Sequence, residues 1–184
     1  MKHEQDSASL TTKVILFFVL RTKGHITKTQ LVKFLYLADL YAVKWLGKQI
    51  TDLKWVYYYF GPWEDDIQAD LERMDGREIN LSNQFSEREI DRSNQQAEIV
   101  LIQLGPNAPF EDELKLPESM KLMLDNIRRE WAGSGTENID RLLKYVYDTA
   151  PMKDVLSQGC SPEEKRSLDL LKEREKLLNE LESY

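Results

Sequence analysis

The chain has 184 residues, of which 31% are charged and 41% apolar, and its formal net charge is -7 at pH 7. This length suits a single domain, residues 1–184, and this composition is that of a globular protein rather than a disordered one. The negative charge argues against nucleic acid as a general partner, because neutralising phosphates requires a clustered positive field. An acidic chain is better suited to a basic protein partner.

Cys160 is the single cysteine, and only His3 and His25 are present as other soft metal ligands. An internal disulfide is therefore excluded, a zinc site lacks ligands, and we expect no metal and no cofactor. The longest apolar run, Val14 to Leu20, is much shorter than the roughly 20 residues that cross a bilayer. The polar start MKHEQDS does not have the pattern of a secretory signal. We expect a cytoplasmic protein without a membrane partner.

Two helices are predicted first along the chain. A short one runs from about Thr11 to Lys23, and a longer one runs from about Lys28 to Leu46. Thr27 and Gln30 have the spacing of a capping box, and Gly47 stands where a left-handed residue ends a helix. The longer helix is apolar on almost all sides, which is typical of a helix buried in the middle of a fold.

An aromatic strand is predicted from Leu53 to Phe60, with aromatic residues on both faces. The central helix can cover one face. The other is either covered by a second helix or left exposed to anchor a partner, since Trp and Tyr dominate interface hot spots. The candidate partner-binding residues are Trp55, Tyr57, Tyr58, Tyr59 and Trp63. Stacking on nucleic-acid bases is disfavoured, because the basic groove it needs is missing.

Pro62 has the properties of the first residue of a helix that ends near Met74, with acids at residues 64–66 that suit its positive end better than a metal or catalytic role. Two further strands are predicted over Arg77–Ser82 and Ala97–Leu104, with Asn83–Gln96 as a long hairpin connection. Together with the aromatic strand they are expected to form one small antiparallel sheet.

Two amphipathic helices are predicted at about residues 117–132 and 137–149, joined by the short connection 133–136 and ended by Pro151. The run Ser161-Pro162-Glu163-Glu164 predicts the start of a last amphipathic helix over about residues 162–183. Its apolar stripe either docks on the body or pairs with a partner or a second copy, as in a homodimer. The stripe residues singled out are Leu170, Leu171, Leu177, Leu178 and Leu181.

The predicted fold class is α+β, mainly α. A helical core surrounds a central buried helix, with a small three-stranded antiparallel sheet and a long C-terminal helix.

The order of these motifs resembles the Panacea domain family, also described as SocA-like or phage-associated. The resemblance is carried by the helix Thr29–Asp39, the strand Lys54–Phe60, the turn Gly61-Pro62-Trp63, the acidic helix start Glu64–Ile67 and the closing run Tyr147–Pro151. It covers roughly residues 10–156 and leaves the C-terminal helix outside.

This resemblance implies an antitoxin-type protein that neutralises a partner toxin, encoded nearby, by direct contact. In some members it also implies an adaptor that presents the toxin to a protease. The family supplies no catalytic residues, and the sequence contains no glycine-rich phosphate loop, GxSxG, HExxH or CxxC motif. A non-enzymatic binding protein is the leading hypothesis.

Two alternatives stay open. One is a small enzyme with a pocket near Asp39 and the aromatic strand. Asp39 is an acid in the most apolar helix, and it either accepts hydrogen bonds from a neighbouring element or acts chemically. The other is a self-associating structural or phage-related interaction protein that uses the C-terminal helix.

Overall fold

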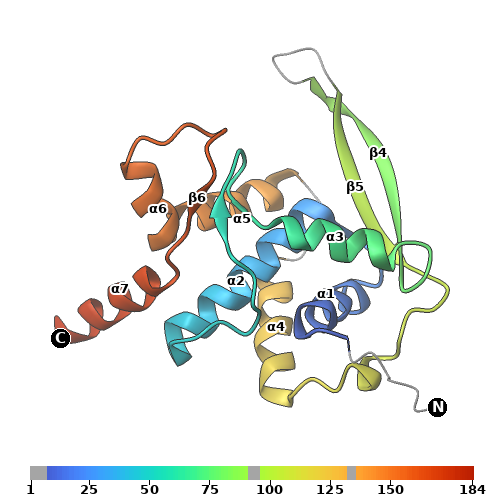
Figure 1. The fold of residues 1–184 in the computed structure, drawn as a ribbon, viewed down its shortest axis with the longest axis horizontal. Coiled ribbons are helices and arrows are strands. Elements are labelled where there is room, and N and C mark those ends of the chain that lie inside the picture. Colours follow the sequence, from blue (N-terminus) through green and yellow to red (C-terminus); the bar gives the residue numbers. More distant parts are fainter. Residues whose placement is uncertain (1–7, 91–95, 132–135) are drawn as a thin grey trace.

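The computed structural model describes residues 8–90, 96–131 and 136–184, and it has the mainly helical α+β fold expected from the sequence (Figure 1). None of the described helices is both long and apolar enough to cross a membrane. The elements in chain order are α1 (Leu10–Arg21), β1 (Ile26–Thr27), α2 (Lys28–Leu46), β2 (Val56–Tyr57), β3 (Pro62–Trp63), α3 (Asp65–Met74), β4 (Ile79–Ile90), β5 (Gln96–Leu104), the 3-10 turn η1 (Glu111–Leu114), α4 (Glu118–Glu130), α5 (Thr136–Asp148), α6 (Ala150–Ser157), β6 (Arg166–Ser167) and α7 (Leu171–Glu182).

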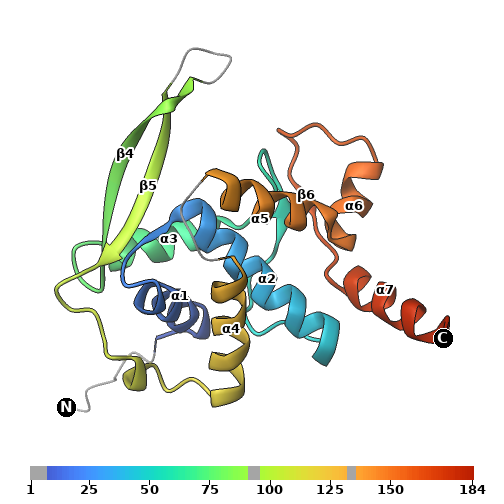
Figure 2. The same ribbon diagram turned by 180° about the vertical axis from the view of Figure 1, so that it is seen from behind.

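Helix α2 forms the centre of the molecule, as predicted. Thr27 and Gln30 form the capping box, and Gly47 ends the helix with a φ of 79°. Every residue from Gln30 to Val43 except Tyr41 is buried. Helices α1, α4, α5 and α7 and strand β5 all contact α2, while the β4–β5 hairpin and α7 extend from opposite ends of the molecule (Figures 1 and 2).

The Asp39 carboxylate attaches the chain after α2 to the helix core. It is fully buried and accepts hydrogen bonds from the backbone N–H groups of Ile50 (3.0 Å) and Thr51 (2.9 Å) and from the Thr51 hydroxyl. The Gln49 amide (3.1 Å) and the Trp55 indole N–H (2.9 Å) also donate to it. All five donors come from the loop that leads into β2. The geometry therefore gives Asp39 a structural task, because a buried carboxylate needs such partners.

The strands form two sheets, and the prediction of one sheet containing the aromatic strand was wrong. One sheet has the order β1-β5-β4 and the other has the order β3-β2-β6. The third strand beside the hairpin is β1, with Ile26 opposite Ile102. The hairpin strands also extend into the predicted connection Asn83–Gln96, as far as Ile90 on one side. Residues 91–95 lie outside the described part of the chain.

The aromatic strand is much shorter than predicted, and the helix after it starts later. Only Val56–Tyr57 pairs as a strand, because the chain reverses at once and Pro62–Trp63 pairs back onto it. Pro62 is therefore a strand residue instead of the first residue of a helix. Helix α3 starts at Asp65, and the Glu64 side chain caps it by accepting from the Asp66 N–H.

Two predictions near the C-terminus also need correction. Pro151 lies in the first turn of an unpredicted helix, α6, which follows a break in the helical backbone at Thr149. The run Ser161–Glu164 starts no helix: the Pro162 carbonyl accepts from the Tyr59 N–H (2.7 Å), and the chain continues as β6 along β2. Helix α7 therefore begins only at Leu171, and the predicted span 162–183 was too long.

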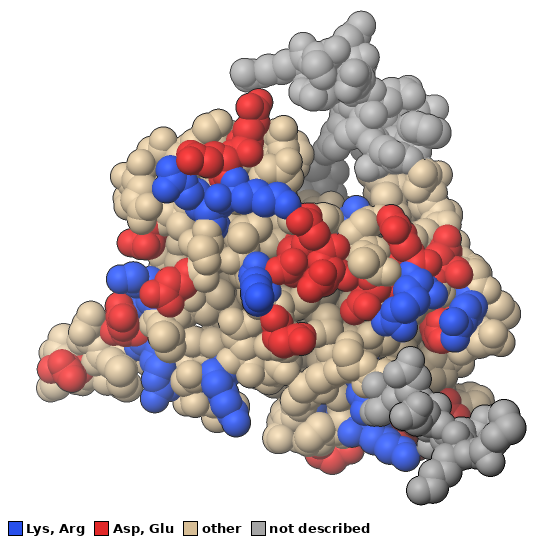
Figure 3. Space-filling view, viewed as in Figure 1, with Lys and Arg blue, Asp and Glu red and all other residues tan. Residues whose placement is uncertain are grey.

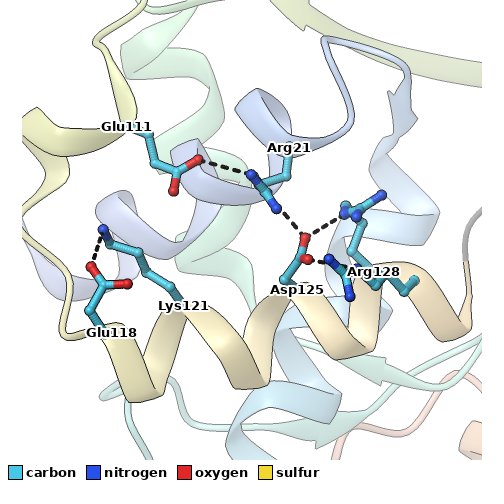
Figure 4. Close-up of polar contacts among 7 residues, drawn as sticks. Arg21, Glu111, Glu118, Lys121, Asp125 and Arg128 are labelled. Carbon is cyan, nitrogen blue, oxygen red and sulfur yellow. Dashed lines mark hydrogen bonds and ion pairs between the residues drawn. The ribbon is translucent and has the colours of Figure 1, made fainter.

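Helices α1 and α4 are joined by ion pairs around Asp125 (Figure 4). The buried Asp125 carboxylate accepts from Arg21 (3.1 Å) on α1 and from Arg128 (2.7 Å) and Arg129 (2.8 Å) on its own helix. The hydrogen bonds from Arg21 and Arg128 hold the pKa of Asp125 well below its usual range. The predicted helix at 117–132 is confirmed as α4, while Ala132 and the connection from residue 133 to residue 135 lie outside the described residues.

We predict that Asp39→Ala destabilises the protein by more than about 3 kcal/mol, because several buried donors lose their acceptor at once. Chemical denaturation at neutral pH measures this. Asp52→Ala is the matched control in the same loop: Asp52 is exposed and accepts one long hydrogen bond, from Thr11 at 3.3 Å. Its loss should cost about 1 kcal/mol or less. Equal losses in the two variants would refute the structural role of Asp39.

Candidate functional site

The tight reversal between β2 and β3 brings aromatic side chains together. We call residues 58–63 the aromatic turn. The Tyr58 N–H donates to the Gly61 carbonyl (3.1 Å) and closes the turn. Tyr59 has a φ of 45° and Gly61 a φ of 115°. A positive φ at a tyrosine is unfavourable, and a backbone outlier of this kind is a reason to look for function.

Gly61 is required where it stands. The reason is its φ, which residues with a side chain rarely adopt. An added Cβ would make only ordinary contacts, 3.4 Å from the Lys33 Nζ and 3.5 Å from the Tyr147 ring. The turn thus packs closely on α2 and α5. It is a fixed part of the structure, held on its other side by the bond from Tyr59 to Pro162.

The rings of the aromatic turn contact one another and are partly open to solvent. The Tyr58 and Tyr59 centroids are 4.5 Å apart at 73°, an edge-to-face arrangement that is favourable for aromatic pairs. Tyr59 is 44% exposed and Phe60 is 80% exposed. The lysine ammonium groups of Lys165 and Lys28 lie 5.1 Å from the Tyr58 ring and 5.0 Å from the Trp63 ring. An exposed phenyl group supported in this way is a suitable protein contact.

A cavity of 320 Å³ lies between the aromatic turn, the first turns of α2 and strand β5. It falls within the size range of small binding sites. Its lining residues are Lys28, Thr29, Val32, Lys33, Tyr58, Tyr59, Phe60, Pro62, Trp63 and Val100. The cavity does not include Asp39 among these residues. The pocket beside the aromatic residues and the buried carboxylate are therefore separate features.

Lys33 is a buried ammonium group at this cavity. Its side chain belongs to α2 and is 4% exposed. The Nζ donates to the Pro62 carbonyl at 3.0 Å, and within the described residues no carboxylate is in ion-pair range. Burial lowers the pKa of Lys33 to about 8.

The predicted partner-binding residues fall into two groups. Trp55 and Tyr57 are buried, with Trp55 packed edge-on against Tyr36 at a centroid distance of 5.5 Å. A partner could reach them only if the fold opened. Tyr58, Tyr59 and Trp63 lie at the surface or partly buried beside the cavity. The two groups differ because the strand ends at Tyr57, so that the alternation of faces predicted for the whole aromatic run does not apply beyond it.

The predicted leucine stripe of the last helix is also divided. Leu170 is buried and Leu177 is half-buried against the body. Leu171, Leu178 and Leu181 are 49%, 45% and 59% exposed. Helix α7 docks on α2 through polar contacts, including a bond from Arg174 to the Lys44 carbonyl (3.1 Å).

Sequence reasoning missed Phe60 and Lys33 as site residues. Phe60 was assigned to a regular strand, although the following Gly61-Pro62 is a turn signal that could have placed it at a loop tip. Lys33 was treated only as an interruption of the apolar helix. In residues 8–90, 96–131 and 136–184, no group of three or more His, Cys, Asp or Glu side chains could hold a metal ion.

A second apolar surface lies between α2 and α4. Trp45, Leu46 and Leu122 are each more than 60% exposed, and a cavity of 360 Å³ adjoins Trp45 and Leu122. This surface is formed by other elements than the aromatic turn. Variants at this surface therefore serve as controls for binding at the turn.

We predict that the burial of Lys33 makes stability depend on pH in alkali. The folded pKa of about 8 lies below the ordinary 10.5, so that the unfolded chain holds more protons between these values and stability rises with pH there. Relative to Lys33→Met, the wild-type free energy of unfolding should rise by about 2 kcal/mol between about pH 7.5 and 9.5. Urea titrations at several pH values measure it. Lys48→Met, at an exposed site, should show the same dependence of the free energy of unfolding on pH as the wild type. If Lys33→Met also showed the wild-type dependence on pH, the prediction would be contradicted.

One of three comparisons with known proteins gives a match. No curated protein and no solved structure matches the chain. A family model described as "Antitoxin SocA-like, Panacea domain" matches residues 31–150, which is more than half of the 184 residues. The match starts within α2, passes through the aromatic turn and the hairpin, and ends at the start of α6. The chain therefore belongs to the SocA-like antitoxin family with a Panacea domain.

Proposed function

We propose that this protein is a non-enzymatic antitoxin that neutralises a cognate toxin, encoded nearby, by direct contact through the aromatic turn. The proposal places it in the cytoplasm, a reducing compartment in which a free thiol such as that of Cys160 is stable. We also propose that the protein acts as an adaptor that presents the bound toxin to a protease. Membership of the antitoxin-like family supports the toxin-related role, and the exposed aromatic turn is the observation that carries the choice of surface.

The aromatic turn has the properties of an interface hot spot. Aromatic residues dominate such spots, and rigid contact groups lose little entropy on binding. Phe60 protrudes, while Tyr58 and Tyr59 brace each other and Lys165 covers Tyr58. The Asp39 hydrogen bonds hold the preceding loop, so that the turn needs little reorganisation when a partner arrives.

Charge beside the turn suits a basic partner. Acidic side chains gather over α3 on the face seen in Figure 3. Glu64, Asp65 and Asp66 lie at the start of that helix, directly after Trp63, and Asp65 is joined to Lys165 at 2.6 Å. Opposite surface potentials accelerate association more than they strengthen it. A toxin with a basic surface would be steered toward the aromatic turn.

We predict that Phe60→Ala and Tyr59→Asn together abolish neutralisation while the protein stays folded. Asn tolerates the positive φ at residue 59, and Phe60 contributes little to the core, so the melting temperature should change by only a few degrees. Loss of hot-spot contacts should weaken the complex by about 30-fold or more. Co-expression with the product of the adjacent gene measures growth rescue, and co-purification measures binding.

Phe110→Ala is the matched control, because Phe110 is also 80% exposed but lies before η1, outside the aromatic turn. It should rescue growth and co-purify as the wild type does. The proposal of this surface fails if the double variant still neutralises the toxin. The antitoxin role itself fails if wild-type protein rescues growth from no adjacent gene product.

We propose self-association through α7 as a second property. Leu171 and Leu178 are two turns apart on one face and Leu181 adjoins them, all three exposed in the described chain. An apolar helix face of this kind is a recurring binding element. Deleting the whole C-terminal segment would be a poor test, since Leu168 and Leu170 are buried and β6 completes a sheet.

Leu178→Glu should convert a homodimer into a soluble monomer, because it puts a charge in the middle of the apolar face. Light scattering after size exclusion measures the mass. Leu122→Glu, at an exposed leucine of α4, should leave the dimer intact. A monomeric wild type, or a Leu178→Glu variant that stays dimeric, would rule out this surface.

A further inference from the structure

The cavity at the aromatic turn differs in charge from the rest of the protein. The whole chain has a net charge of -7, and acids gather over α3 nearby. Among the described residues that line the cavity, however, the two charged ones are both lysines, Lys28 and Lys33. Asp65, just after the turn, does not line the cavity and is held by Trp63 and Lys165.

The Lys33 ammonium group has N–H donors that are not used in the described structure. An ammonium group carries three N–H donors, and the Nζ of Lys33 donates one hydrogen bond, to the Pro62 carbonyl at 3.0 Å. The group is almost completely buried, so water supplies little compensation. A buried charge is stabilised above all by an opposite charge that also accepts hydrogen bonds.

The walls of the cavity favour an apolar neighbour for such a group. Tyr58, Phe60 and Trp63 form one side, and Val32 and Val100 contribute aliphatic surface. A free inorganic anion would leave these walls without a contact. A side-chain carboxylate next to an aromatic or branched residue in a polypeptide would accept hydrogen bonds from Lys33 and contact these walls as well.

From this geometry we propose that the cavity is a receptor for a partner's Glu or Asp side chain, with Lys33 as the anchor and the aromatic turn contacting the apolar residue beside that carboxylate. This inference rests on the proposed function and deepens it, since it specifies the chemistry of the segment that the partner inserts. The proposed binding surface then has two parts. The acids on α3 attract a basic partner, and the cavity selects one acidic side chain of that partner.

The test uses the 184-residue chain, labelled with ¹⁵N, and two short probes. These are acetyl-Lys-Phe-Glu-Leu-Lys-amide and the same peptide with Gln in place of Glu. The general negative field of the protein favours the more positive Gln peptide. Tighter binding of the Glu peptide must therefore come from a local positive site. The indole N–H resonance of Trp63, assigned with Trp63→Phe, reports on the cavity.

The Glu peptide should bind about tenfold or more tightly than the Gln peptide, as expected for a charge-assisted hydrogen bond. Lys33→Met should abolish this preference, because it removes the ammonium group and keeps most of the side-chain volume. Leu122→Ala, outside the cavity, should leave it unchanged. A well-dispersed spectrum of each variant confirms its fold.

Three outcomes would overturn the inference: equal affinity for the two peptides, a preference that survives in Lys33→Met, or no change at Trp63 with either peptide. A stronger response to the oligonucleotide dT10 than to the Glu peptide would also overturn it, in favour of phosphate and base binding. Failure here is separable from failure of the antitoxin role. Co-purification of the adjacent gene product that depends on Phe60 would keep that role even if the peptides do not bind.

Discussion

The buried carboxylate of Asp39 is the interaction on which the arrangement of the surface depends. It lies inside the central helix, and its five hydrogen bonds reach forward to Gln49, Ile50, Thr51 and Trp55. These bonds fix where the chain leaves α2 and how it enters β2. The aromatic turn follows at once, so the position of Tyr59 and Phe60 at the surface is set from the core. Asp39, for which the sequence left a structural and a chemical role open, is the internal attachment point of the loop that leads to the aromatic turn.

The position of α2 was predictable because its signals are local. The capping pair Thr27 and Gln30, the stop at Gly47 and the apolar residues on all sides lie within one stretch and agree with one another. The helix containing Met123 and the one containing Val146 were found for the same reason, since each has a clear amphipathic period. Where a segment's own residues decide its conformation, reasoning from sequence is sufficient.

The errors arose where distant contacts decide. Ser161-Pro162 has every mark of a helix start, but hydrogen bonds to Tyr59 and pairing with β2 hold that segment extended. The aromatic run was expected to be one long strand, but the turn at Tyr59 ends it after two residues. The donors to Asp39 lie 10 to 16 residues away, and no spacing rule connects them to it. Lys33 could be recognised as a site residue only once the turn was seen to close over it.

The proposed antitoxin function assigns different tasks to neighbouring parts of one surface. Helix α3 supplies negative charge, the aromatic turn supplies apolar contact area, and the cavity with Lys33 supplies a position for a single carboxylate. Such a division combines steering with selectivity, because attraction by itself does not distinguish among basic proteins. A family with this scaffold could change partners by altering the turn and the cavity while keeping the core around α2.

Hydrogen exchange of the protein, with and without the product of the adjacent gene, tests the central claim most directly. The account predicts slower exchange on complex formation at residues 57–63 and in the first turns of α2, with little change in α4. Protection confined to α7 or to the surface around Trp45 and Leu122, with the aromatic turn unaffected, would contradict it.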